Sequence, residues 1–289
     1  MSKPKKSLGQ NFLKSEKIAE EIVSAGEVGS DDIVLEVGPG KGILTEKLLE
    51  KAKKVIAVEK DKQLVEFLKE KFAREINNSK LEIISGDILK FNPMSRRDLD
   101  IGRYKIIANI PYYITSHFLR TFLESDKQPS LMVLMVQKEV AERIVGAKSG
   151  ARRNFSRFTL PRSGVGSDAS QNFALPRSFA NKESLLSISV KAYGRPEIVR
   201  SVPAGYFSPA PKVDSAVIKI SGISKNFFQD IGEKKFFEIV KKGFSQKRKM
   251  LINNLKAQKD DFTACNIGEK ARAENLSLEQ WKCLTFLMK

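Results

Sequence analysis

Short apolar segments alternate with amphipathic segments through the first half of the chain, and this alternation constrains the fold more than any other feature. Buried strands are predicted at Asp32 to Val37, Lys54 to Glu59, Leu81 to Asp87, Tyr104 to Ile110 and Leu131 to Gln137. Helical spacing of apolar residues predicts helices at Ser15 to Ala25, Ile43 to Lys51, Lys62 to Phe72, Ser116 to Leu123 and Lys138 to Val145. Apolar strands separated by helices are typical of a doubly wound, mostly parallel α/β sheet, which we therefore predict.

The second half of the chain has three kinds of pattern. Residues 149–181 show no helical or strand period and are predicted to form an irregular insertion. Beyond it, strands are predicted at Leu185 to Tyr193, Glu197 to Val202 and Ala216 to Ile220. From residue 224 the pattern becomes helical and rich in lysine. We therefore predict a first domain of residues 1–223 and a small, basic, all-helical domain of residues 224–289.

The charge balance indicates a polyanionic partner. Lys and Arg total 51 against 34 Asp and Glu, a formal net charge of +17, so RNA or DNA is the expected partner. The only cysteines are Cys265 and Cys283, which have no metal-ligand spacing, and His117 is the only histidine. We therefore expect no metal site, no disulfide scaffold and no histidine-based triad.

The chain shows no membrane or export signal. Its apolar runs fall short of the roughly 20 residues of a membrane span, and the start MSKPKKSLGQNFL lacks a signal-peptide core. We expect a cytoplasmic, reducing location.

A glycine-rich turn follows the first predicted strand. LEVGPGKG contains Gly38, Gly40 and Gly42, whereas the dinucleotide fingerprint G-x-G-x-x-G needs glycine at position 43, which is isoleucine. This spacing favours S-adenosylmethionine as the cofactor. Glu59 ends the next strand, where a carboxylate can accept hydrogen bonds from ribose hydroxyls, and Asp87 is placed to accept from an adenine amine. Alternatively, each carboxylate caps the helix that follows it.

The segment NIPYYIT begins at the end of the fourth predicted strand, at the sheet edge where ligands bind. The side-chain oxygen of Asn109 and the carbonyl of Ile110 can hold the hydrogens of an adenine amine and free its lone pair for a methyl donor. Pro111 makes the turn rigid, and Tyr112 offers a ring face for a flipped base. The alternative is an ordinary turn with aromatic rings in the core.

Seven motifs in order resemble the ribosomal RNA adenine dimethyltransferase family: GQNFL (Gly9 to Leu13), LEVGPGKGILT, VEKD, GDIL, NIPYYIT, FSPAPKVDS and FSQKRKML. The resemblance is strongest to the bacterial small-subunit branch of the family, and it covers nearly the whole chain except the insertion. It implies a Rossmann-like catalytic domain that transfers methyl groups from S-adenosylmethionine. The implied targets are two adjacent adenosines in the 3′-terminal hairpin loop of 16S ribosomal RNA, each dimethylated at N6, with a role in small-subunit biogenesis. A monomer acting on the small ribosomal subunit is expected.

The resemblance also implies roles for individual residues. Cofactor contacts carry over to Asn11, Leu13, Gly38, Gly40, Glu59, Asp87 and Asn109. Phe207 resembles a second stacking ring opposite Tyr112, its alternative being an ordinary buried phenylalanine. The basic segments Lys3 to Lys6 and Gln246 to Met250 are expected to contact phosphates.

Three other functions stay open at this point. One is the macrolide-resistance branch of the family, which methylates large-subunit RNA, and another is a dinucleotide-dependent oxidoreductase. The third is a ribosome-assembly or nucleic-acid-binding factor without catalysis. The insertion either extends the RNA contact through its arginines or is inert, and the sequence does not decide between these.

Overall fold

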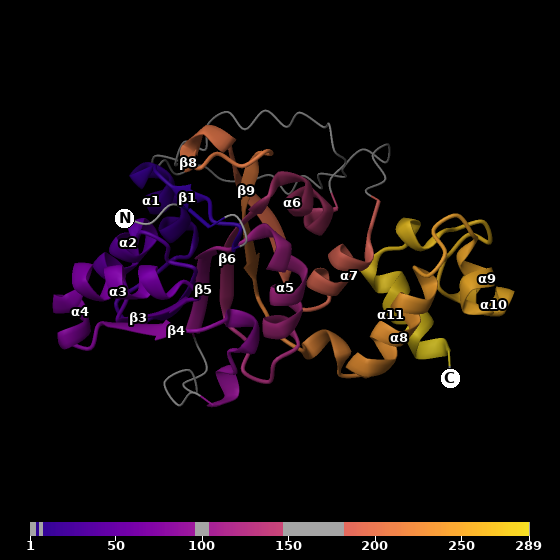
Figure 1. The fold of residues 1–289 in the computed structure, drawn as a ribbon. Coiled ribbons are helices and arrows are strands. Elements are labelled where there is room, and N and C mark those ends of the chain that lie inside the picture. The colour runs from indigo at the N-terminus through magenta and orange to yellow at the C-terminus, as the bar shows by residue number, and fades with distance from the viewer. Residues whose placement is uncertain (1–3, 6–7, 96–103, 147–181, 289) are drawn as a thin grey trace, which may run out of the picture.

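The computed structural model of the chain describes residues 4–5, 8–95, 104–146 and 182–288 (Figure 1). The predicted insertion at 149–181 lies outside the described residues, as do Lys3 and Lys6 of the basic segment Lys3 to Lys6. Within the described part, no helix is long and apolar enough to cross a membrane.

The core is a seven-stranded sheet with the order β4-β3-β2-β5-β6-β9-β7. The strands are β2 (Ile33–Val37), β3 (Lys54–Glu59), β4 (Leu81–Ser85), β5 (Tyr104–Asn109), β6 (Leu131–Gln137), β7 (Arg195–Val202) and β9 (Ser215–Ser221). Pairing is parallel from β4 to β6, whereas β9 runs antiparallel to both of its neighbours, β6 and β7. The predicted doubly wound, mostly parallel sheet is confirmed.

Helices cover both faces of the sheet (Figure 1). Successive strand residues point to opposite faces, so Val34 joins one hydrophobic cluster and Leu35 the other. The cluster of Val34 contains residues of α1 (Glu16–Ala25), α2 (Ile43–Lys51) and α3 (Lys62–Lys71), with the short α4 (Ala73–Asn77) beside them. The cluster of Leu35 contains residues of α5 (Thr115–Leu123), α6 (Lys138–Val145) and α7 (Leu185–Lys191).

The predicted strand at Leu185 to Tyr193 is wrong, because this segment forms helix α7. Its serines and β-branched residues resemble a strand, but Ser184 and Ser187 form a reciprocal cap at the helix start. Ser184 Oγ accepts from the Ser187 N–H at 3.1 Å, and Ser187 Oγ accepts from the Ser184 N–H at 2.6 Å. The buried side of the helix, which includes Ile188 and Val190, packs in the same cluster as α5 and α6. Local capping and tertiary packing therefore override the strand propensity of the sequence.

The last strand is followed by helices, as the sequence predicts. These are α8 (Glu233–Gly243), α9 (Leu251–Leu255), α10 (Lys259–Ala264) and α11 (Leu278–Leu287). The hydrophobic cluster of Leu35 continues into them, since the ring of Tyr193 packs 5.0 Å from that of Phe228 and 5.8 Å from that of Phe237. The division at residues 223 and 224 stays a prediction.

A disulfide joins Cys265 to Cys283 and links the end of α10 to α11. The sequence expectation of no disulfide scaffold did not anticipate it, because two cysteines alone carry no pairing signal.

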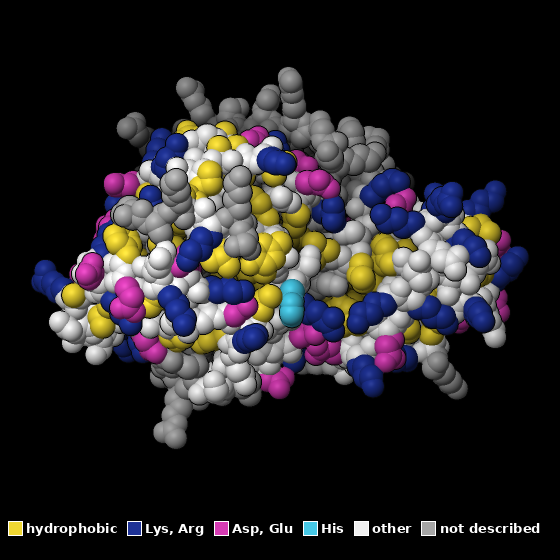
Figure 2. Space-filling view, viewed as in Figure 1, with side chains coloured by type: hydrophobic (Ala, Val, Ile, Leu, Met, Phe, Trp, Pro, Cys, Tyr) yellow, Lys and Arg dark blue, Asp and Glu magenta, His cyan; other side chains and the backbone are white. Residues whose placement is uncertain are grey.

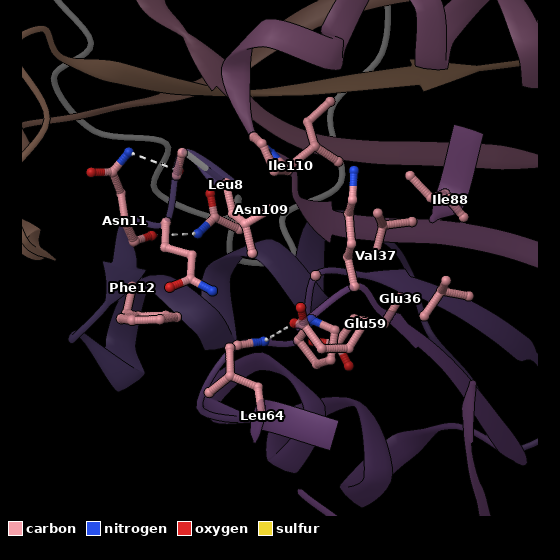
Figure 3. A pocket seen from close by; sticks show the side chains of 18 of the residues that line it. Leu8, Asn11, Phe12, Glu36, Val37, Glu59, Leu64, Ile88, Asn109 and Ile110 are labelled. Carbon is pink, nitrogen blue, oxygen red and sulfur yellow. Dashed lines mark hydrogen bonds between the residues drawn. The ribbon is translucent and has the colours of Figure 1, made fainter. Parts of the chain in front are cut away.

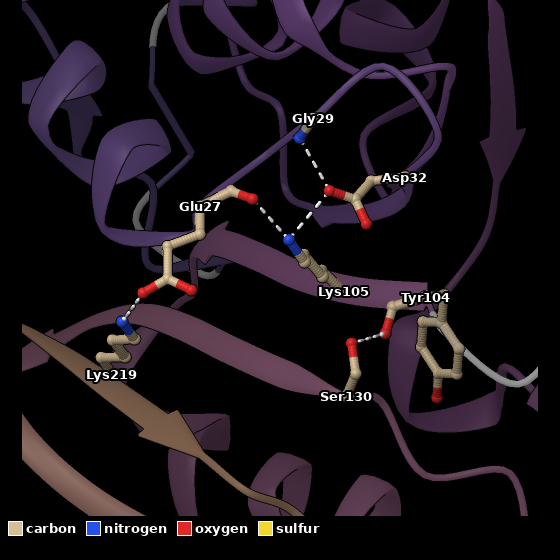
Figure 4. A network of polar contacts seen from close by, with 7 residues as sticks. All are labelled: Glu27, Gly29, Asp32, Tyr104, Lys105, Ser130 and Lys219. Atoms are coloured by element: carbon tan, nitrogen blue, oxygen red, sulfur yellow. Dashed lines mark hydrogen bonds and ion pairs between the residues drawn. The ribbon is translucent and has the colours of Figure 1, made fainter.

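The amino ends of the central strands are tied together by a polar network (Figure 4). The ammonium of Lys105, near the start of β5, donates to the Glu27 carbonyl at 2.6 Å and to Asp32 Oδ2 at 2.8 Å. Lys219 of β9 donates to the Glu27 carboxylate and lowers its pKa. These bonds hold the loop between α1 and β2 at the sheet edge opposite the carboxyl ends of β2, β3 and β5.

Candidate active site

A pocket opens at the carboxyl ends of the parallel strands, where the chain order reverses (Figure 3). The chain runs outward from β2 through β3 to β4, then returns to place β5 on the other side of β2. Open α/β sheets bind ligands at such a switch point. The predicted site residues that line this pocket are Asn11, Leu13, Gly38, Gly40, Glu59, Asp87, Asn109 and Tyr112. Phe207 is not among its lining residues.

The glycine turn serves protein packing as well as ligand access. A Cβ atom on Gly40 would lie 2.9 Å from the Phe12 ring, and one on Gly42 would lie 2.6 Å from the Phe72 ring. On Gly38 the nearest atom would be the Asn109 carbonyl oxygen, at 3.8 Å. Two of the three glycines therefore let aromatic rings pack against the turn, whereas a Cβ on Gly38 would make only an ordinary contact with the Asn109 carbonyl.

Glu59 is buried at the end of β3 and holds the glycine turn. Its Oε1 accepts from the Asp61 N–H at 2.8 Å, and its Oε2 accepts from the Gly40 N–H at 3.3 Å. Burial raises the pKa of Glu59, and the N–H groups of Asp61 and Gly40 oppose the rise. The carboxylate is thus fixed in one orientation at the pocket wall.

A second buried carboxylate, Glu36, lines the same pocket and was missed in the sequence analysis. It is 1% exposed on β2, and neither carboxylate oxygen has a hydrogen-bond partner among the described residues. Burial raises the pKa of Glu36 to about 8; the nearby Thr45 hydroxyl opposes the rise, and the Glu59 carboxylate adds to it. The available signal was a charged residue inside the apolar strand segment IVLEV.

Asp87 lines the pocket beyond β4 and also caps a short helical turn. Its Oδ1 accepts from the Leu89 N–H at 3.1 Å, and its Oδ2 accepts from Lys60 Nζ at 2.9 Å. The hydrogen bond from Lys60 lowers the pKa of Asp87. The capping alternative is therefore present in the structure, and a ligand amine would have to share the carboxylate with Lys60.

The side chain of Asn109 is oriented by the N-terminal segment. Its Nδ2 donates to the main-chain oxygen of Asn11 at 3.2 Å, and the Asn11 side chain in turn donates to the Gly9 carbonyl at 3.3 Å (Figure 3). Because the amide nitrogen of Asn109 is engaged in this way, its oxygen is the atom placed to accept from a ligand. The motifs GQNFL and NIPYYIT, far apart in sequence, thus form one wall.

Tyr112 follows this wall and is held by its hydroxyl group. The hydroxyl lies 2.6 Å from Ser215 Oγ, at the start of β9. Burial raises the pKa of Tyr112, and the Ser215 hydroxyl opposes the rise. Tyr113, next in the chain, is 64% exposed at the pocket rim.

Phe207 lies beneath the pocket, in strand β8 (Phe207–Ser208). This strand pairs with β1 (Phe12–Leu13), which places Phe207 opposite Leu13. The ring is 2% exposed and belongs to the hydrophobic cluster of Val34. A base could stack on this ring only after the ring becomes exposed.

Other candidate groups lie away from the pocket. His117 is exposed on α5. In the part of the chain that the structure describes, no group of three or more His, Cys, Asp or Glu residues is placed to hold a metal ion. Lys247, Arg248 and Lys249 are exposed between α8 and α9. Figure 2 shows lysine and arginine side chains gathered over the C-terminal helices.

The chain is similar to curated bacterial proteins over almost its whole length. It is 40% identical over 288 residues to "Ribosomal RNA small subunit methyltransferase A" of Dehalococcoides mccartyi, which covers 97% of this chain and 87% of the relative. A protein of the same name from Clostridium botulinum is 35% identical and covers 96% of this chain and 90% of the relative.

Solved structures share the fold. A dimethyladenosine transferase from Plasmodium falciparum aligns with a TM-score of 0.68 and 26% identity over 94% of this chain and 95% of its own. The 23S rRNA methyltransferase ErmE aligns with a TM-score of 0.70 over 95% of this chain and 98% of its own, but at 22% identity it supports the fold alone.

The family resemblance noted from the seven motifs is tested by a family model. The model described as "Ribosomal RNA adenine dimethylase" matches residues 1–161 and 172–287, so it spans nearly the whole chain and omits only part of the predicted insertion. Five of the seven motifs that resemble this family, GQNFL, LEVGPGKGILT, VEKD, GDIL and NIPYYIT, line the pocket described above. The chain therefore belongs to the ribosomal RNA adenine dimethylase family.

Proposed function

We propose that this protein transfers methyl groups from S-adenosylmethionine to N6 of two adjacent adenosines in the 3′-terminal hairpin loop of small-subunit ribosomal RNA. The observation that carries the proposal is the placement of Asn109. Its amide is oriented by the Asn11 carbonyl, next to Tyr112 and in the same pocket as Glu59. Cofactor and base sites therefore meet at one side chain.

The pocket residues fit S-adenosylmethionine. Glu59 and Asp87 are acceptors for ribose hydroxyls and the adenine amine, Gly38 adds no side chain to the pocket, and Asn11 and Leu13 also line it. Glu36 adds a buried carboxyl group to this pocket, and its oxygens have no hydrogen-bond partner among the described residues, so a bound cofactor can supply one. When bound, S-adenosylmethionine supplies an electrophilic methyl group.

The target base is held for attack by acceptors and a ring. The Asn109 side-chain oxygen and the Ile110 carbonyl accept the two hydrogens of the adenine amine, which turns its lone pair toward the methyl donor. Tyr112 stacks on the extruded base, which is worth about 1–3 kcal/mol. The methylated amine is strongly acidic and loses its proton readily, so the site needs no general base.

Phe207 remains in the proposal as the second aromatic residue of the base site. Because its ring is buried opposite Leu13, it contributes to stacking only if the pair of β1 and β8 shifts when RNA binds.

The substrate is the small ribosomal subunit rather than the large one. Support comes from the segment FSQKRKML, which resembles the small-subunit branch, and from the name of the curated relatives. The net charge of +17 and the exposed Lys247, Arg248 and Lys249 suit phosphate contacts, so residues 224–289 serve as an RNA-binding domain. The protein acts as a monomer in the cytoplasm, with a role in subunit biogenesis.

Nucleoside mass spectrometry tests the proposal. Small subunits that lack this modification are incubated with the protein and S-adenosylmethionine, and large subunits are treated in parallel. We expect N6,N6-dimethyladenosine at the adjacent pair in small subunits only. Product confined to large subunits would instead support the macrolide-resistance branch. Absence of any product, with cofactor binding verified by calorimetry, would support a binding factor without catalysis.

A further inference from the structure

Asp61 lies outside the pocket lining but binds parts of the chain that form two of its walls. It is 3% exposed at the start of α3, where its Oδ1 accepts from the Gln63 N–H at 3.1 Å and caps the helix. The same carboxylate accepts from Lys5 Nζ at 2.7 Å and from Gln10 Nε2 at 2.9 Å. Both partners belong to the N-terminal segment, 56 and 51 positions away.

These contacts exceed what a helix cap requires. One oxygen suffices to cap α3, whereas here Oδ2 binds Gln10, and Oδ1 is shared between Lys5 and the helix. The main-chain N–H of Lys5 also donates to Gln10 Oε1 at 2.7 Å, which orients the amide group of Gln10. Burial acts to raise the pKa of Asp61, but the hydrogen bonds from Lys5 and Gln10 outweigh it and lower the pKa. The carboxylate is therefore ionised and bound to the N-terminal segment.

The main chain of Asp61 contacts Glu59, the carboxylate of the proposed ribose site. Its main-chain N–H donates to Glu59 Oε1 at 2.8 Å, and Glu59 Oε2 accepts from Gly40 in the glycine turn. Gln10 is followed at once by Asn11, Phe12 and Leu13, which line the pocket. Asp61 thus contacts both the N-terminal segment that lines the pocket and the Glu59 carboxylate at the pocket wall.

We infer that Asp61 is a positioning residue, which holds the segment Leu8 to Leu13 against the pocket and thereby sets the affinity for the cofactor. The inference rests on the proposed function, since it takes S-adenosylmethionine as the ligand. Asp61 acts through Gln10 and Glu59 and does not line the pocket, so its loss weakens cofactor binding. The pairing of Phe12 and Leu13 with β8 still anchors the neighbouring Asn11, which orients Asn109, so the chemistry of the bound complex changes little.

Two variants test the inference. Asp61→Asn keeps an oxygen for the helix cap but removes the charge that pairs with Lys5, and Lys5→Met removes the same ion pair from the 41% exposed partner. We expect Asp61→Asn to raise the calorimetric Kd and the KM for S-adenosylmethionine about tenfold, with kcat and the KM for RNA within about twofold. Lys5→Met raises the Kd in the same direction, and adding it to Asp61→Asn has little further effect.

Controls separate positioning from general destabilisation. Lys69→Met removes an exposed ion pair with Glu66 on the same helix, and we expect its cofactor Kd to be unchanged. Thermal unfolding without cofactor verifies that each variant is folded. If Asp61→Asn does not fold, Lys5→Met alone decides, because its side chain is largely outside the core.

Two results would overturn the inference. One is a wild-type cofactor Kd in folded Asp61→Asn, or in Lys5→Met if Asp61→Asn does not fold. The other is a fall in kcat with an unchanged cofactor Kd. Failure of the wild-type protein to bind S-adenosylmethionine would overturn the proposed function instead.

Discussion

The hydroxyl of Tyr112 lies 2.6 Å from Ser215 Oγ and joins two segments that are 103 positions apart in the chain. Ser215 is fully buried at the first position of β9, so it is a rigid partner. The orientation of the proposed stacking ring is thus set from the antiparallel strand of the sheet. This explains how FSPAPKVDS, which ends at Ser215, contributes to a site formed mainly by NIPYYIT.

Substitutions at Tyr112 separate the ring from its hydroxyl group. Tyr112→Phe keeps the stacking face and loses one hydrogen bond, so we expect kcat/KM for RNA to fall about 3–10-fold. Tyr112→Ala also loses the stacking, and a fall of about 100-fold is expected. Steady-state kinetics on small subunits measure both. Tyr206→Phe, outside the pocket, is the matched control. Equal activity of Tyr112→Ala and Tyr112→Phe would contradict a stacking role.

The Asn109→Ala variant removes the proposed acceptor for the adenine amine. We expect kcat to fall about 100–1000-fold, because the lost interaction acts on the reacting nitrogen. RNA binding, measured by filter retention, should stay close to wild type, since phosphates carry most of that affinity. Asn78→Ala, in an exposed turn, serves as the control. An equal loss of RNA affinity would remove the support for a catalytic role of Asn109.

Gly42→Ala tests the packing of the glycine turn. The residue has a φ of +82°, and an added Cβ would lie 2.6 Å from the Phe72 ring. We expect the free energy of unfolding to fall by about 2–4 kcal/mol, as strain and overpacking combine. Urea denaturation measures the change. Gly268→Ala places its Cβ in open space and should have little effect. Similar stabilities of the two variants would show that the turn relaxes around the new methyl group.

Glu36→Gln tests the buried carboxyl group through pH. In the folded chain, burial raises the pKa of Glu36 from 4.5 to about 8. Between these values the unfolded chain loses the proton and the folded chain keeps it, so this group destabilises the fold increasingly as pH rises from 4.5 to 8. Glutamine does not titrate. We therefore expect the free energy of unfolding of Glu36→Gln, relative to that of the wild type, to increase by about 2–4 kcal/mol between pH 5 and pH 8.

Urea denaturation without cofactor at the two pH values measures the effect of Glu36→Gln. The exposed Glu66→Gln, on α3, is the control and should show no such trend. A difference from wild type that does not change with pH would mean that Glu36 titrates normally in the folded protein.

The central sheet could be predicted because its strands and helices carry local periodic signals. β2, β3, β5 and β6 are buried on both faces, so each is a mostly apolar run bounded by turn residues or by a helix. Several site residues followed from the same reasoning, since the carboxyl ends of parallel strands converge on one edge. Glu59 is the last residue of its predicted strand and of β3, and Asn109 lies one residue before the predicted end of its strand and is the last residue of β5.

What the sequence did not reveal depends on distant contacts. The sequence of α7 predicts a strand because its residues have strand propensity. The segment forms a helix because of the cap at its start and its packing against the rest of the chain. The pairing of Phe12 and Leu13 with β8 has no local signal, and it decides the burial of Phe207. The role of Asp61 is equally non-local, because its partners Lys5 and Gln10 lie in another part of the chain.

The pairing of β1 with β8 has a consequence for synthesis. Residues 12 and 13 are synthesised before the parallel part of the sheet, but their strand partner, residues 207 and 208, is synthesised only after it. A nascent chain that already holds β2 to β6 and the glycine turn therefore still lacks the anchored N-terminal wall of its pocket. We therefore expect the chain to become able to hold the cofactor only after residues 207 and 208 have been made, when Phe12 and Leu13 can pair with β8.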